Sequence, residues 1–526
     1  MAQGGGYTFS QVPTAEIPRS SFNRSHGHKT TFDSGYLIPI YVDEALPGDT
    51  FNLKASLFAR LATPIVPIMD NLHLEVFFFA VPNRLVWQNW QRFCGEQPDP
   101  GDSIDFLVPQ VHPSDAEAGF LTGSIFDYFG IPTNVGGIVA SALFSRAYNL
   151  IYNEWFRDEN LIPRAIVNVG DGPDDADFYP LQRRGKRHDY FTSCLPWPQK
   201  GPGVELPVGG MATVVTDGST PTFRHGVTGD EAPFEQNVNQ SPNVEWNGPA
   251  TFVDPNFQFG STTGLVADLS TSTAVTINSL RQAFQIQKLL ERDARGGTRY
   301  VEILKSHFGV TSPDARLQRP EFLGGGSIPV NINPVTQTSR TEGTAALGDL
   351  AGYGIAAGSG FGFNKSFVEH CVILGLCMVR ADLSYQQGLP KMFSRRTRYD
   401  FYWPAFSHLG EQAVLQREIF ATGTEQDDVV FGYQERWAEY RYFPSKITGK
   451  FRSDLAAGDT SLDFWHLAQD FAAAPVLNKD FIEEHPPVER VVAVVTEPQF
   501  IFDSHFKIKC TRPMPTYSVP GMIDHF

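Results

Sequence analysis

Residues 70–90, which read DNLHLEVFFFAVPNRLVWQNW, decide the fold. In an extended strand alternate side chains share a face, and here one face carries Leu72, Leu74, Val76, Phe78 and Ala80. The opposite face carries His73, Glu75, Phe77, Phe79 and Val81, so beyond its first residues the strand is apolar on both sides. An antiparallel sheet in a lone domain usually leaves one face to water. We therefore expect this strand to be covered twice, once by a second sheet and once by a helix layer, a long loop or another subunit.

The end of the same stretch supplies candidate anchors for that cover. Pro82 has no N–H to donate and should end the strand. Trp87 and Trp90 follow within one helical turn. With the two outward phenylalanines they make the predicted interface anchors, Phe77, Phe79, Trp87 and Trp90.

Composition indicates a β protein with long loops and large buried contacts. The 526 residues include 42 Phe, 38 Pro and 47 Gly, and charged residues make up only 19%, below the usual quarter. The net charge of −16 argues against binding nucleic acid over the whole surface. It leaves room for a locally basic face.

Strand-like runs are short, widely separated and without a βαβ rhythm, which is typical of an antiparallel sandwich or jelly roll. The predicted strands are 37–42, 51–59, 72–81, 368–382, 412–421, 433–443 and 499–510. Residues 1–36 are predicted to be an extended basic arm that carries Arg19, Arg24 and Lys29, and residues 37–526 form the jelly-roll domain.

Two insertions into this domain differ in charge and structure. Residues 201–275 contain eight carboxylates and a single Arg or Lys, Arg224, and are expected to be a surface insertion with short β pieces. Residues 278–309 are helical in pattern. A first helix should end at Gly296-Gly297, and a second, shorter one at Gly309.

The search for catalytic and metal motifs is largely negative. No Gly-Lys-Ser/Thr phosphate loop, nucleophile elbow or HExxH motif occurs. The dinucleotide-like pattern at Gly352 lies in GYGIAAGSGFGF, which cannot open a helix. His26 and His28 have no third ligand nearby, and the five cysteines match no zinc spacing. We expect no enzyme activity, cofactor or metal, and we expect the cysteines to be small buried side chains.

The positive signal is the pairing of cations with aromatic residues in two clusters. The first comprises Arg183, Arg184, Lys186 and Arg187, beside Tyr190 and Phe191, and the second comprises Lys391, Arg395, Arg396 and Arg398, among Phe393, Tyr399, Phe401, Tyr402 and Trp403. Cations neutralise phosphates and aromatic rings stack on unpaired bases, which suits single-stranded nucleic acid. The alternative is a subunit interface in which the cations meet carboxylates of a neighbouring copy. Both readings stay open.

The N-terminus, MAQGGGYTFSQVP, lacks the basic start and apolar core of a signal peptide. No apolar run reaches the about 18 residues that a membrane span needs. We expect a protein made and used in a reducing cytoplasm, with no membrane insertion.

Several long blocks resemble the major capsid proteins of gokushoviruses, small single-stranded DNA phages of the Microviridae. They are PRSSFNRSHGHKTTFDSGYLIPIYVDEALPGDTFNL (18–53), the strand at 70–90, the helical block at 278–310, GYQERWAEYRYFPSKITGKFR (432–452) and the tail MPTYSVPGMIDHF. The weakest match is 201–275.

The resemblance implies a single eight-stranded viral jelly roll, sixty copies of which build a T=1 icosahedral shell around single-stranded DNA. It implies that residues 201–275 project outward near the threefold axes toward a bacterial receptor, and that the arm faces the genome. A small basic DNA-binding protein and a DNA pilot protein of the phage are candidate partners. The expected location is the virion, assembled in the host cytoplasm.

A different class stays as the alternative, a secreted β-rich protein that binds or cleaves carbohydrate. Such proteins are also rich in aromatic residues and loops, but they normally carry the signal peptide that is missing here.

Overall fold

The structure is a computed structural model that describes residues 17–204, 213–219, 222–225, 230–236, 244–246, 257–259, 265–268, 277–339, 347–455 and 459–517. The chain forms two compact units. The main unit comprises Met1–Pro198 and Arg292–Phe526, and the inserted unit comprises Gln199–Glu291.

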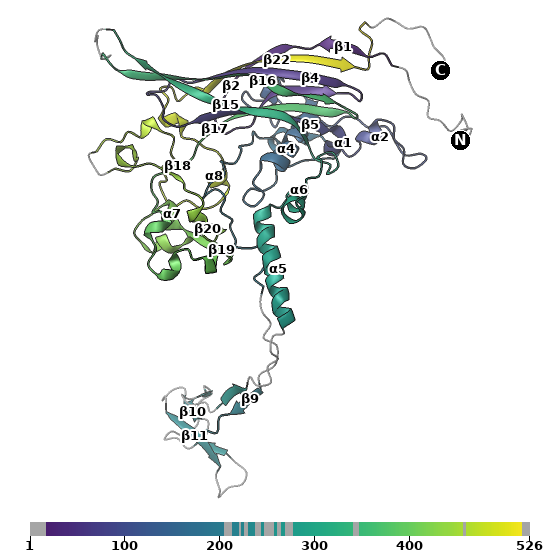
Figure 1. The fold of residues 1–526 in the computed structure, drawn as a ribbon. Coiled ribbons are helices and arrows are strands. Elements are labelled where there is room, and N and C mark those ends of the chain that lie inside the picture. Colours follow the sequence, from purple (N-terminus) through teal and green to yellow (C-terminus); the bar gives the residue numbers. More distant parts are fainter. Residues whose placement is uncertain are drawn as a thin grey trace, which may run out of the picture. The chain divides into compact units, whose positions relative to one another are not determined.

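The main unit is built on one antiparallel sheet of nine strands (Figure 1). The strand order is β1-β22-β4-β16-β15-β5-β17-β3, and β2 also pairs with β22. The bounds are β1 Ser20–Asn23, β2 His26–Phe32, β3 Ile38–Ala45, β4 Thr50–Leu61, β5 Leu72–Pro82, β15 Glu321–Thr336, β16 Leu350–Ser366, β17 Cys371–Ala381 and β22 Phe500–Arg512. Neighbours in the sheet therefore come from opposite ends of the chain.

The sheet curls so that its two ends face each other. β3 and β22 lie far apart in the strand order, yet the rings of Tyr41 and Phe506 are 5.1 Å apart. Phe78 of β5 and Phe363 of β16 likewise meet at 5.7 Å. Buried side chains of β3, β4, β5, β16, β17 and β22 form one core between the two layers. This is a jelly-roll sandwich with insertions, and the predicted fold class is confirmed.

β5 is covered on both faces, as its pattern predicts. Leu74, Val76 and Phe78 belong to the core of the sandwich. Phe79 and Val81 belong to a second core with α4, Leu143–Ile151. The second cover is thus the segment that follows β5 in the chain, and it lies within the subunit.

A buried ion pair ties this covering segment together. Arg146 of α4 donates from Nε and Nη2 to the two carboxylate oxygens of Asp174, at 2.7 and 2.8 Å, and both side chains are fully buried. Burial by itself would raise the pKa of Asp174, but the hydrogen bonds from Arg146 and Tyr179 outweigh it and hold the pKa below its ordinary value. The remaining guanidinium nitrogen, Nη1, donates to the carbonyls of Val86 and Gly170.

Most predicted strands exist, with four differences. β19 spans Glu411–Leu415, and α7, Gln416–Ile419, follows it where 412–421 was expected to stay extended. β20 spans Val430–Glu435, so the prediction of a strand over 433–443 is wrong beyond Glu435. The chain leaves β20 at Trp437, whose φ is 71°. β15 and β16 were not predicted. Residues 20–32 are extended as expected, but β1 and β2 pair with β22 in the main sheet.

The helical block follows its prediction. α5 spans Ile277–Gly296, and α6, Tyr300–Ile303, continues as a π-helical turn to Phe308. Gly309 ends it with a φ of 69°, a left-handed conformation that glycine adopts readily.

The inserted unit has the expected short β pieces. Its strands are β9 Thr213–Thr216, β10 Thr222–His225, β11 Glu231–Gln236, β12 Val244–Trp246, β13 Phe257–Phe259 and β14 Leu265–Asp268. They pair as β12-β11-β10-β13 and as β14-β9. The rest of residues 201–275 beyond Val204 lies mostly outside the described residues.

The buried ion pair gives a prediction for stability. Replacing Asp174 by Ala leaves the Arg146 guanidinium buried without its charge partner, so the free energy of unfolding should fall by about 3–5 kcal/mol. Equilibrium urea unfolding of the subunit measures this. The exposed pair of Lys29 and Asp503, 3.3 Å apart, is the matched control, and Asp503→Ala should cost less than about 1 kcal/mol. Equal costs for the two changes would contradict the structural role of the buried pair.

Candidate contact surfaces

The cations of the first predicted cluster make contacts with other residues of the same subunit. Arg183 lies 3.7 Å from the centre of the Tyr36 ring and donates to the carbonyl of Glu484 at 3.0 Å. Lys186 is buried and donates to Gln469 at 2.8 Å and to the carbonyl of Phe481. Burial lowers the pKa of Lys186 to about 8. These contacts favour a structural role.

Three arginines of the main unit converge on one carboxylate of β5. Glu75 is buried and pairs with Arg184, with Arg380 at 2.6 Å and with Arg187 at 3.5 Å. Burial by itself would raise the pKa of Glu75, but Arg184 and Arg380 outweigh it and lower the pKa below its ordinary value. Arg187 also binds Asp382 at 2.9 Å. These cations therefore hold β5 and β17 to the connecting loops.

The three predicted cations of the arm differ in their contacts and in their exposure to solvent. Arg24 pairs with Asp43 at 2.6 Å, and Arg19 donates to the carbonyl of Gly48. Lys29 points outward, with a side chain that is 78% exposed.

The four predicted anchors pack within the subunit. Phe79 lies 5.5 Å from Trp155, and Phe77 lies 5.2 Å from Phe156. Trp87 is fully buried and donates from Nε1 to Asp171 at 2.7 Å. Trp90 is half-buried against Trp87, with ring centres 6.1 Å apart. Their predicted role at a subunit interface is not needed to explain their burial.

The second predicted cluster divides into inner and outer cations. Lys391 donates to the carbonyl of Ala413 at 3.0 Å, and Arg395 donates to Glu439 at 3.3 Å. Arg396 and Arg398 are exposed.

Residues 436–452 join this cluster, which sequence reasoning missed. The Tyr402 ring lies 5.7 Å from Trp437 and 6.3 Å from Tyr440, and the Arg395 guanidinium lies 4.2 Å from the Tyr440 ring. We call residues 391–403 and 436–452 together the cationic patch. The signal that could have found it is composition, since 436–452 alone holds five Arg or Lys and one carboxylate.

The cationic patch exposes large apolar rings. The side chains that are exposed by more than two-fifths are Met392, Phe393, Tyr399, Phe401, Tyr402, Trp403, Tyr440, Tyr442 and Phe443. Between its two segments lies a pocket of about 260 Å³, lined by Met392, Phe393, Tyr442, Phe443 and Ile447 among others. A gathering of exposed large hydrophobic side chains of this kind is typical of an interaction site.

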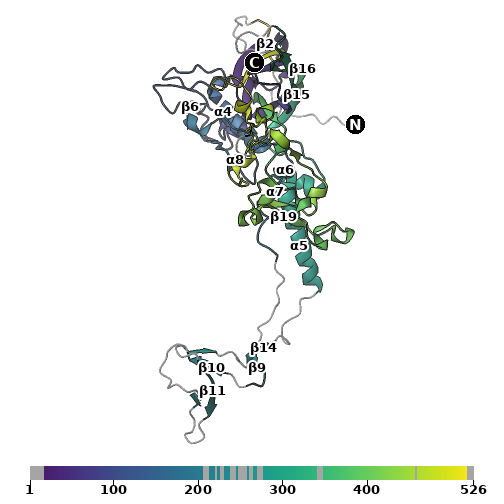
Figure 2. The ribbon, with the colours of Figure 1, turned by 90° about the vertical axis from the view of Figure 1, so that its left-hand side faces the viewer.

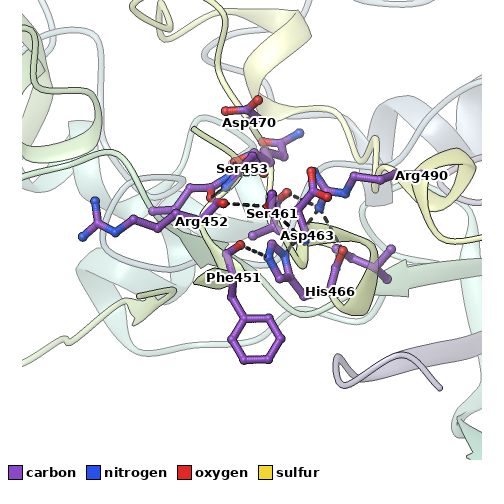
Figure 3. A network of polar contacts seen from close by, with 12 residues as sticks. Phe451, Arg452, Ser453, Ser461, Asp463, His466, Asp470 and Arg490 are labelled. Atoms are coloured by element: carbon purple, nitrogen blue, oxygen red, sulfur yellow. Dashed lines mark hydrogen bonds and ion pairs between the residues drawn. The ribbon is translucent and has the colours of Figure 1, made fainter. Parts of the chain in front are cut away.

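A polar network fixes the C-terminal end of the patch (Figure 3). A ring nitrogen of His466 lies 2.6 Å from the carbonyl oxygen of Phe451, and Ser461 donates to the carbonyl of Arg452 at 2.7 Å. Arg490 donates to the carbonyl of His466 at 2.8 Å and lies 3.8 Å from Asp463. The backbone at the C-terminal end of the patch is therefore held in place by polar contacts with residues 461–490.

Across the described residues, no group of three or more His, Cys, Asp or Glu side chains is placed to hold a metal ion. No helix in this same part of the chain is long and apolar enough to cross a membrane.

The arginine cluster on Glu75 gives a pH prediction. Because the folded-state pKa lies below the ordinary value of 4.5, the ionised carboxylate contributes stability above that pH and loses it as the pH falls through the folded-state pKa. At pH 7 Glu75→Gln should lower the free energy of unfolding by about 3–5 kcal/mol. Urea unfolding should show the gap to the wild type narrowing as the pH falls below 4.5 toward the folded-state pKa of Glu75. A gap that does not change with pH would contradict the predicted ion pairs.

Comparison with known proteins shows the family of the chain. Residues 10–522 match the family described as capsid protein (F protein). The chain is 49% identical to capsid protein VP1 of Bdellovibrio phage phiMH2K, over 99% of this chain and 98% of that one. It is 44% identical to capsid protein VP1 of Chlamydia phage 1, over 98% and 97% of the two chains.

Capsid protein VP1 of Spiroplasma virus 4 is 37% identical, again over 98% and 97% of the two chains. The resemblance to the major capsid proteins of Microviridae-type phages is thereby confirmed. The chain belongs to the F-type family of phage capsid proteins.

Proposed function

We propose that sixty copies of this chain form a T=1 icosahedral shell that encloses a single-stranded DNA genome. The observation that carries the proposal is the cationic patch, a broad exposed surface of aromatic rings on a chain of the capsid family. Aromatic residues and arginine are enriched in protein interfaces, and a monomer rarely leaves so many rings in water.

A second surface suits the packaged DNA. The outward face of the paired strands β4 and β22 carries Lys54, Arg60, Lys507 and Lys509, all of them exposed. Lys54 and Lys507 lie directly opposite each other in the strand register. Like charges at opposed positions repel, so a polyanion on this face would relieve the repulsion. β2, with the exposed Lys29, pairs with the other edge of β22.

The proposal predicts the size and content of the particle. Sixty copies of the 58.4 kDa chain give a protein shell of about 3.5 MDa, which light scattering measures. Wild-type particles should protect single-stranded DNA from nuclease. A triple variant, Lys54→Gln, Lys507→Gln and Lys509→Gln, should form shells in normal yield with less DNA per particle, because it removes phosphate partners.

Two outcomes would count against these claims. A chain that stays a stable monomer under conditions of phage assembly would contradict the shell. Unchanged DNA content in the triple variant, with unchanged shell yield, would contradict the genome-facing role of the β4–β22 face.

We also propose that the acidic insertion at 201–275 serves attachment to the bacterial surface. It supplies eight carboxylates and one Arg or Lys in 75 residues, and its described strands form small sheets of their own. Shortening it should leave the yield of particles intact and lower their adsorption to host cells. Collapse of assembly would instead mark the insertion as an interface element.

A further inference from the structure

Two surfaces of the main unit carry opposite charge. The cationic patch holds nine Arg or Lys and two carboxylates. Residues 93–142, which we call the acidic loops, hold seven Asp or Glu and no Arg or Lys. This separation is marked in a chain whose overall charge is −16.

The outer cations of the patch are mostly free of carboxylates of their own subunit. Arg396, Arg398, Lys446 and Lys450 are exposed, and none of the four takes part in an ion pair among the described residues. Arg398 stacks on Trp403, 4.8 Å from the ring centre. The patch therefore presents cations that no carboxylate of the described residues neutralises, and two of them, Arg398 and Lys446, lie over aromatic rings.

Four carboxylates of the acidic loops likewise take part in no ion pair among the described residues. Glu96, Asp99, Asp105 and Glu117 are exposed, and apolar side chains stand among them. Leu107 is 84% exposed and Leu121 is 62% exposed. The acidic loops, with exposed leucines among carboxylates, are therefore chemically complementary to the cationic patch, with exposed aromatic rings among cations.

The two surfaces lie on different parts of the main unit. The acidic loops begin at the end of α2, Trp90–Phe93, which lies away from β19, β20 and α7 in Figure 1. In Figure 2, β6 of the acidic loops, Gln110–His112, likewise lies away from β19 and α7. The patch packs on β19, because Lys391 binds the carbonyl of Ala413. Two complementary surfaces set apart on one subunit allow a head-to-tail contact between copies, which closes into a ring when the rotation permits.

We propose that the cationic patch of one copy docks on the acidic loops of the next copy, as a heterologous contact that repeats around a symmetry axis of the shell. The proposal rests on the proposed function, in that it requires the chain to assemble into a closed shell. It names the two surfaces that meet and the direction of the contact.

A second copy fits the patch better than nucleic acid does. A polyanion would satisfy the cations of the patch, but it would leave the exposed leucines of the acidic loops in water. A second copy covers both surfaces in one contact. The patch also combines exposed aromatic rings with arginines, which are residue types enriched in protein interfaces.

The pocket in the patch gives the contact a specific anchor point. An apolar cavity of about 150 Å³ can hold benzene, so the 260 Å³ pocket has room for a branched aliphatic side chain. Leu107 is the most exposed apolar residue of the acidic loops. We assign it as the side chain that enters the pocket of the neighbouring copy.

Charge reversal tests the proposal in the full chain. The patch variant carries Arg396→Glu, Arg398→Glu and Lys450→Glu, and the loop variant carries Asp99→Lys, Asp105→Lys and Glu117→Lys. Each should lower particle yield by about tenfold or more, because like charges then face each other. A chain with all six changes restores opposite charges at every contact, and its yield should return to within about threefold of the wild type. That rescue also shows that the variants fold.

A matched control reverses the same number of charges elsewhere. Lys54→Glu, Lys507→Glu and Lys509→Glu should leave shell yield unchanged while DNA content falls. Leu107→Ser should lower shell yield without any change of charge, and Leu121→Ser, also exposed, should lower it less.

Cross-linking of wild-type particles gives direct evidence. Particles assembled from a mixture of ¹⁴N- and ¹⁵N-labelled chains are treated with a carbodiimide, which joins lysine amines to carboxylates in contact. Mass spectrometry should find Lys446 or Lys450 joined to Glu96, Asp99, Asp105 or Glu117, in peptide pairs of mixed isotope.

The outcomes separate this proposal from the proposed function. Wild-type chains that form no shell would overturn the proposed function. Wild-type shells with normal assembly of the patch and loop variants would overturn the head-to-tail contact alone. If the patch variant forms normal shells that contain less DNA, the patch binds nucleic acid and the head-to-tail contact is wrong. If the cross-links join the patch to residues 201–275, the insertion is the surface that the patch contacts, and the assignment of the acidic loops is wrong.

Discussion

The structure depends on the burial of β5 and β17 from both sides. One face of each strand belongs to the sandwich core, and the other belongs to the core around α4. The folded sheet needs the segment around α4 for its stability, because without that segment apolar side chains such as Phe79 and Leu374 would be exposed to water. The insertion after β5 is therefore a structural part of the subunit, and the Arg146–Asp174 pair lies inside it.

Electrostatics follows from the same arrangement. Cations near the strands that are buried on both faces form ion pairs with buried carboxylates, as Arg184 and Arg380 do with Glu75. The outer cations of the cationic patch and the lysines on the outward face of β4 and β22 stay exposed. A strongly acidic chain thus keeps a few basic surfaces free, and those surfaces are where contacts with other copies and with DNA are proposed.

The sequence allowed prediction of the apolar strands and not of the glycine-rich ones. β22 shows the period of two of a half-buried strand, and β5 and β17 show the nearly continuous apolar run of a strand that is buried on both faces. β15 and β16 are rich in glycine, which has low strand propensity. The fold nevertheless requires glycine at some of these positions, because neighbouring side chains or backbone occupy the space that a Cβ atom would take. A Cβ at Gly326 would lie 2.4 Å from the Phe361 ring. The second half of the cationic patch escaped prediction because its pairing with the first depends on contacts between Tyr402 and Trp437, which no local pattern shows.

Hydrogen exchange of the free subunit against the assembled particle tests the central claim that β5 is covered twice by its own chain. The amides of β5 and β17 should be strongly protected in the free subunit and gain little on assembly. Amides of 391–403 and 436–452 should gain protection in the particle. Rapid exchange of β5 in the free subunit, with protection appearing only in the shell, would show that neighbouring copies supply the second cover and would contradict the account.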